Sequence, residues 1–140
     1  MTDDHATAED RTEAQRYLDD MVARRGYVLD YHKVMAAQDF PVLKAADDLV
    51  SAAYLSQRLL SPQTKELLFI LSLTVLRSQP AHIASHIRVA LKLGVTPEEI
   101  LEALEIALPE AGVVAFQHGF DVWRDVVGAA GLEPSDTDVR

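Results

Sequence analysis

Cysteine is absent from this sequence of 140 residues. Its absence excludes disulfide bonds, a catalytic thiol, thiolate metal ligands and cysteine redox cycling, because each of these needs the sulfur atom of that side chain. Any chemistry of this chain must therefore come from carboxylates, imidazoles and other groups without a thiol.

Positive charge is also scarce. The chain has 13 lysine and arginine residues against 22 aspartate and glutamate residues, which gives a formal net charge of −9. The basic residues are scattered along the sequence, whereas binding to phosphate groups depends on clustered positive charge. The composition therefore disfavours a nucleic acid or an anionic membrane surface as a partner.

Long hydrophobic runs are missing as well. The longest, Leu67–Leu76, is shorter than the roughly 18 apolar residues that a membrane-spanning helix requires. The first ten residues, MTDDHATAED, are acidic and differ from the basic start of a secretory leader. We therefore expect a soluble, cytoplasmic protein with no membrane partner.

No segment alternates between apolar and polar residues with a period of two, and apolar residues recur at helical spacing along most of the chain. This pattern predicts an all-α protein of six to seven helices joined by short loops, in which neighbouring helices are antiparallel. The length is that of one domain. We expect it to cover residues 11–131, between a flexible acidic N-terminus at 1–10 and a flexible tail at 132–140.

Proline marks the expected start of several helices, because it fits the first helical turn. Ser61-Pro62 predicts one helix start, and Asp39-Phe40-Pro41 predicts another, for a helix that reaches Tyr54. Thr96-Pro97-Glu98-Glu99 has the form of a capping box, in which the side chains of Thr96 and Glu99 each bond the other's backbone N–H. Gly94 suits the left-handed position after a helix end. We interpret the charge runs Asp47-Asp48 and Glu98-Glu99 as solvated or capping residues.

The stretch from Lys65 to Ala107 holds most of the groups that could perform chemistry. Leu67–Leu76 is apolar on nearly every side, which predicts the central helix of the domain. After it, His82 and His86 are four residues apart, so that on a helix both imidazoles lie on one face. We expect the functional site on this face.

The same stretch resembles a known family. An acidic helix start with KELL, an apolar run, a short polar link and ASHIRVALKLGVTPEEI, followed by a glycine-led aromatic helix, is similar to the carboxymuconolactone decarboxylase family. RGYVLDYHKVMA upstream extends the likeness to about residues 25–127. The resemblance implies the alkylhydroperoxidase D-like helical bundle, assembly into dimers, trimers or hexamers, and an active pocket beside the helix of His86.

The redox branch of this family carries a C-x-x-C-x-x-x-H pattern and an upstream glutamate that relays protons with the histidine. Alignment on His86 puts the two cysteine positions at Gln79 and His82, so this chain resembles a cysteine-free member without thiol peroxidase activity. The upstream glutamate matches Glu66, with one extra residue before Gln79. Either the link Arg77–Pro80 bulges, or the match is shifted. The decarboxylase branch, which this chain resembles more, uses proton transfer on an anionic lactone without a metal or organic cofactor.

The expected catalytic residues are thus His86, Glu66 and His82. An imidazole suits acid–base catalysis at neutral pH because its usual pKa is about 6.5. Each residue also has a structural interpretation: His86 as a hydrogen-bonded core histidine, Glu66 as a carboxylate near the positive end of its helix, and His82 as a residue of the first turn. The His82/His86 spacing also occurs in zinc sites, with Glu66, Gln79 or His118 as supplementary ligands, but we expect no metal and no cofactor.

Gln79, Arg88 and His118 are the expected substrate-binding residues. The guanidinium of Arg88 could bind a substrate carboxylate with two parallel hydrogen bonds, and His118 lies on the last helix in FQHGF. For Arg88 and His118 a solvated surface position is the alternative.

Two functions agree with these residues. The first is a cofactor-free lyase or isomerase that moves a proton on a small carboxylated, cyclic or enolisable compound. The second is a non-catalytic oligomeric family member or small-ligand binder. Hydrogen bonding between Glu66 and His86 would favour the first, and apolar filling of the space around them would favour the second.

Overall fold

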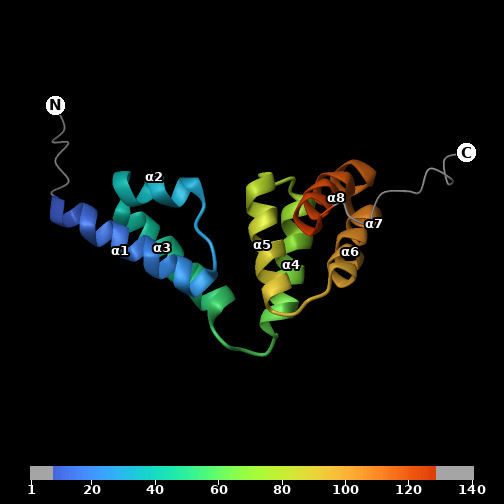
Figure 1. Cartoon of the computed structure of the whole chain (residues 1–140), viewed down its shortest axis with the longest axis horizontal. Helices are drawn as coiled ribbons and strands as arrows, with labels where there is room; N and C mark the ends of the chain where they lie inside the picture. Colours follow the sequence, from blue (N-terminus) through green and yellow to red (C-terminus); the bar gives the residue numbers. More distant parts are fainter. Residues whose placement is uncertain (1–7, 129–140) are drawn as a thin grey trace, which may run out of the picture. The chain divides into compact units, whose positions relative to one another are not determined.

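The computed structural model describes residues 8–128, drawn in colour in Figure 1. Within this range the chain forms eight α-helices and one π-helical turn, and no strand. The all-α class expected from the sequence is confirmed. The segments expected to be flexible lie outside the described residues, except for residues 8–10, with which the first helix begins.

The chain divides into two compact units, one ending at Leu59 and the other beginning at Leu60. The single domain over residues 11–131 stays a prediction. The elements of the first unit are α1 (Ala8–Arg25), α2 (Asp30–Gln38), α3 (Phe40–Val50) and the π-helical turn η1 (Ser51–Leu55). Its core is small, with α1 packed on α2 and α2 on α3. It consists of Ala14, Leu18, Met21, Ala36 and Leu43.

The sequence predicted one continuous helix from Pro41 to Tyr54, but the α-helix ends at Val50 and continues as η1. A π-helical turn holds more residues than an α-helical one, so it changes which side chains face inward. The side chain of Tyr54 is buried at its end.

Asp47 corrects one interpretation of the sequence. Asp48 is exposed as expected, but Asp47 is only 2% exposed and lies four residues after the buried Leu43, on the same face of α3. Arg25 and Arg24 both form salt bridges with its carboxylate, and the Tyr17 hydroxyl donates to it over 2.7 Å. A buried carboxylate needs such partners, because an unpaired buried charge is costly.

These contacts change the pKa values of the groups involved. Burial raises the pKa of Asp47, but the hydrogen bonds from Tyr17, Arg24 and Arg25 and the charge of Arg25 outweigh it, so the pKa is lowered overall. Burial, the hydrogen bond to Asp47 and its negative charge raise the pKa of Tyr17 to about 12. The first unit is thus held together by a buried ionic cluster as well as by its apolar core.

The second unit consists of α4 (Pro62–Val75), α5 (Pro80–Lys92), α6 (Pro97–Glu105), α7 (Ala107–Ala111) and α8 (Val113–Val127). α4 packs against every other helix of this unit (Figure 1). It is therefore the central helix of the second unit, as the apolar run in the sequence indicated. Leu68 on α4 nevertheless remains 52% exposed, so α4 is not surrounded on every side.

The caps of these helices agree with the sequence. The Ser61 hydroxyl accepts from the backbone N–H of Thr64 at the start of α4. Thr96 and Glu99 form both bonds of the capping box at the start of α6. Gly94 has φ +89°, the left-handed conformation expected after α5. The helix after Thr96 is interrupted at Ile106, shortly before the proline in α7.

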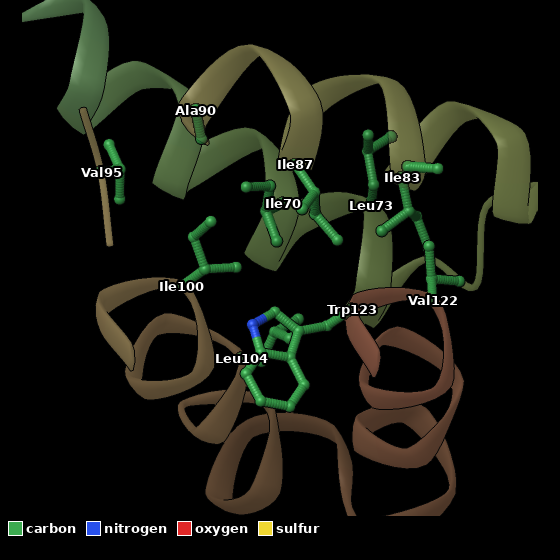
Figure 2. Packing of buried hydrophobic residues seen from close by; sticks show 11 residues of the cluster. Ile70, Leu73, Ile83, Ile87, Ala90, Val95, Ile100, Leu104, Val122 and Trp123 are labelled. Carbon is green, nitrogen blue, oxygen red and sulfur yellow. The ribbon is translucent and has the colours of Figure 1, made fainter. Parts of the chain in front are cut away.

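The core of the second unit lies where α4 and α5 face α6 and α8. Figure 2 shows the indole of Trp123, from α8, beside Leu104 of α6. The indole N–H donates to the Pro97 carbonyl over 3.0 Å, so this buried polar atom is satisfied. The cluster comprises Ile70, Leu73, Ile83, Ala84, Ile87, Ala90, Val95, Ile100, Leu104, Val122 and Trp123. No helix among the described residues is long and apolar enough to span a membrane.

Candidate active site

A carboxylate and an imidazole meet inside the second unit. Nδ1 of His86, on α5, lies 2.8 Å from Oε2 of Glu66, on α4, and each residue is only 1% exposed. An ionised carboxylate can only accept a hydrogen bond, so Nδ1 donates. The bond fixes the neutral imidazole in the tautomer whose basic lone pair is on Nε2. This is the arrangement by which a carboxylate orients a histidine that acts as a general base.

Helix periodicity explains why these two side chains are buried. Glu66 precedes Ile70 by four residues and Leu73 by seven, so it lies on the face of α4 that enters the core. His86 is adjacent to Ile87 and three residues after Ile83, at the edge of the buried face of α5. Since α4 and α5 pack together, the two polar positions face each other.

The ring of His86 has two aromatic neighbours. The ring of Phe69, three residues after Glu66 on α4, is stacked on it with centroids 4.6 Å apart and planes 7° from parallel. The ring of His82 is tilted by 41°, with its centroid 5.3 Å away. His82 is half-buried, and thus more exposed than the pair beside it.

A third histidine is connected to this group through the link between α4 and α5. Nδ1 of His82 is 3.3 Å from the Ser78 hydroxyl, and Nε2 of His118, on α8, is 2.7 Å from the Ser78 carbonyl oxygen. Arg77, immediately before, has φ +54° and so adopts the left-handed conformation. The sequence left open whether this link bulges or the match of Glu66 is shifted. The link turns sharply at Arg77, and the side chains of Glu66 and His86, on the two sides of the link, are hydrogen-bonded.

The structure brings together the three expected catalytic residues, Glu66, His82 and His86. The expected substrate-binding residues are placed differently. Gln79 is the exposed residue before α5, Arg88 is exposed on α5, and His118 is half-buried with Nε2 bound to the backbone. In the described part of the chain, no group of three or more histidine, aspartate or glutamate side chains is arranged to hold a metal ion.

Two residues of this site were not singled out from the sequence. Phe69 follows Glu66 by three residues, and this helical spacing could have placed it on the same side of α4. Ser78 precedes His82 by four residues, but it lies in the link before α5, and its contact depends on the left-handed turn at Arg77. No local signal indicated that turn, because arginine seldom adopts it.

The sequence is similar to a known protein family. The model of the carboxymuconolactone decarboxylase family matches residues 41–125, which is more than half of the chain and includes Glu66, His82, His86 and His118. No curated protein matches the sequence. No solved structure matches either.

Proposed function

Because the chain belongs to the carboxymuconolactone decarboxylase family, we propose that it is a cofactor-free lyase or isomerase acting on a small carboxylated, cyclic or enolisable compound. The observation that carries the proposal is the buried hydrogen bond between Glu66 and His86. A general base needs a defined tautomer and a fixed position, and this bond provides both. A histidine with a purely structural role could donate its Nδ1–H equally well to a backbone carbonyl.

In this proposal His86 moves the proton, and Glu66 orients its ring and stabilises the imidazolium that forms. Loss of CO₂ from an anionic lactone leaves an electron pair on carbon that is delocalised into the lactone carbonyl. His86, which has first taken a proton from solvent, gives this proton to carbon and returns to the neutral imidazole. In an isomerisation, the neutral imidazole first removes a proton beside the carbonyl and afterwards returns it at another carbon.

His82 is proposed to exchange protons between His86 and solvent. Its ring lies beside that of His86, and it is the more exposed of the two. The contact of Gln79 and Arg88 with a substrate carboxylate stays a prediction. A thiol peroxidase activity is excluded by the lack of cysteine.

We also propose that the protein is a homo-oligomer. Apolar residues spaced along the outer faces of α3 and α4 are exposed, and burial of such faces stabilises association. Leu49 on α3 is 71% exposed and Leu68 on α4 is 52% exposed. A monomer of 15.5 kDa in light scattering at micromolar concentration would contradict this proposal. The cytoplasmic location stays a prediction.

The proposed activity can be tested by incubating the protein in D₂O with carboxymuconolactone and a panel of related carboxylated lactones and β-keto acids. NMR would follow both loss of CO₂ and deuterium incorporation at carbon. We expect turnover of at least one compound, unaffected by a metal chelator and abolished by heat denaturation. Absence of both reactions across the panel would contradict an enzyme of this class and favour the non-catalytic alternative.

A further inference from the structure

Ser78 connects two histidines that lie on different helices. Its carbonyl oxygen is 2.7 Å from Nε2 of His118, and its hydroxyl is 3.3 Å from Nδ1 of His82. A carbonyl oxygen only accepts hydrogen bonds, so Nε2 of His118 must carry a proton and donate it. This contact joins α8 to the link that precedes α5, across 40 residues of sequence.

The link needs such support because of its backbone conformation. Arg77 has φ +54°, a left-handed conformation that is unfavourable for residues other than glycine. The backbone N–H of Ser78 bonds the Leu73 carbonyl over 2.9 Å, which closes the end of α4. That bond holds the amide side of Ser78, while the bond from His118 holds its carbonyl side.

The position of His118 is in turn fixed by the core. A Cβ atom on the adjacent Gly119 would lie 2.3 Å from the Thr74 hydroxyl oxygen and 2.8 Å from Leu104. Only glycine allows α8 to approach the end of α4 this closely. The approach places His118 against Ser78, four residues beyond Thr74.

We propose that Ser78 and His118 are positioning residues for His82, with His118 acting on the His82 imidazole through the backbone and hydroxyl of Ser78. A histidine that exchanges protons with a buried partner must keep its ring in one orientation, since a misplacement of about 1 Å can cost roughly 10²-fold in rate. His118 therefore acts on the site through Ser78 and does not bind substrate. The purpose of this device rests on the proposed function, but its existence can be tested without a substrate.

The test is NMR of the imidazole nitrogens in protein labelled with ¹⁵N-histidine. In the unmodified protein, we expect Nε2 of His118 to be protonated and its proton to exchange slowly. Ser78→Ala should move the ¹⁵N shifts of His82 and the midpoint of its pH titration. His118→Leu should move both in the same direction, because it removes the bond that holds the Ser78 carbonyl and so releases the Ser78 hydroxyl from its position.

Two controls separate positioning from general damage. His118→Gln retains a donor and should restore much of the His82 signal, whereas Gln117→Leu, the same replacement at the exposed neighbouring position, should leave it unchanged. Trp123 fluorescence should be native in all variants. The shifts in the double variant Ser78→Ala/His118→Leu should be no larger than those in Ser78→Ala alone, because both changes break one connection.

The proposal is overturned if His118→Leu leaves the His82 titration at its unmodified midpoint while Ser78→Ala moves it, or if the two effects add fully. An unprotonated Nε2 on His118 would overturn it as well. These outcomes are independent of turnover. If coupling is observed but no lactone reacts, the positioning device stands and the proposed enzymatic function fails.

Discussion

The imidazole of His86 is held between a carboxylate and a phenyl ring, with Nδ1 2.8 Å from Glu66 and the ring of Phe69 stacked 4.6 Å away. Both contacts come from α4, and both favour a single ring orientation. Stacking on an aromatic face also stabilises a cation. The two side chains thus fix the tautomer and the ring orientation of His86, as the proposed proton transfer requires.

Glu66→Gln tests whether the charge of the carboxylate is needed. The amide has nearly the same shape and can still accept a hydrogen bond from Nδ1, but it cannot stabilise an imidazolium ion by charge. We expect turnover of a lactone substrate to fall by about 10²-fold or more, the range typical of impaired acid–base catalysis. Glu66→Gln turning over as fast as the unmodified protein would limit Glu66 to a packing role.

Gly119→Ala should destabilise the second unit. In an exposed helix this change stabilises by about 0.5–1 kcal/mol, but here the new methyl group would collide with Thr74 and Leu104. Overpacking of this kind costs about 1–3 kcal/mol. Urea unfolding followed by fluorescence of Trp123, the only tryptophan, measures it. Gln117→Ala, exposed on the same helix, is the control and should change stability by less than about 0.5 kcal/mol.

Thr74→Val should make the second unit at least as stable as it is in the unmodified protein. The Thr74 hydroxyl is buried and has no hydrogen-bond partner, and such a group costs about 1–3 kcal/mol. Valine keeps the shape and removes the polar atom. The exposed Thr64, whose hydroxyl is bonded to Ser61, is the matched control, because Thr64→Val should give no gain. A clear loss of stability in Thr74→Val would show that the hydroxyl has a role in the core.

The first unit should lose stability in acid because of Asp47. Its pKa is lowered in the folded state, so its ionised form contributes stability above the unfolded value of 3.8, and this contribution is lost as pH falls through the folded value. All four tyrosines precede Leu60, so tyrosine fluorescence reports on this unit. Asp47→Asn should cost about 3–5 kcal/mol at neutral pH, because Arg25 loses its buried counter-charge.

The exposed neighbour supplies the control for this experiment. Asp48→Asn should change stability by less than about 0.5 kcal/mol and keep the acid dependence of the unmodified protein. Equal effects of the two substitutions would contradict the assigned importance of the buried cluster.

Tyr17 should make the first unit lose stability as pH rises, whereas Asp47 makes it lose stability as pH falls. Its pKa is raised to about 12, so its neutral form contributes stability below the usual tyrosine value of 10, and this contribution disappears as pH rises from there through about 12. Spectrophotometric titration should detect the ionisation of Tyr17 near pH 12 in the folded protein. Tyr17→Phe should remove that step, and its persistence would assign it to another tyrosine.

The sequence predicted the helices of the second unit well, since its proline starts, capping box and glycine end are local signals that the packing does not oppose. Helical spacing put His82 and His86 on one helix face, whereas Glu66 was indicated only by the family resemblance, which left its register open. The π-helical turn, the burial of Asp47 and the role of Ser78 were not predicted. The last two depend on partners far along the chain, as Asp47 depends on Arg24 and Arg25 and Ser78 on His118.

The decisive experiment replaces His86 with glutamine and makes two measurements. One is turnover of a reacting lactone in D₂O, and the other is unfolding of the protein followed by Trp123 fluorescence. Glutamine keeps much of the volume and can donate to Glu66, but it cannot titrate. We expect decarboxylation or deuterium incorporation to fall by about 10²–10⁴-fold, with the folded protein retained. Turnover at the unmodified rate in a folded His86→Gln protein would contradict proton transfer by His86.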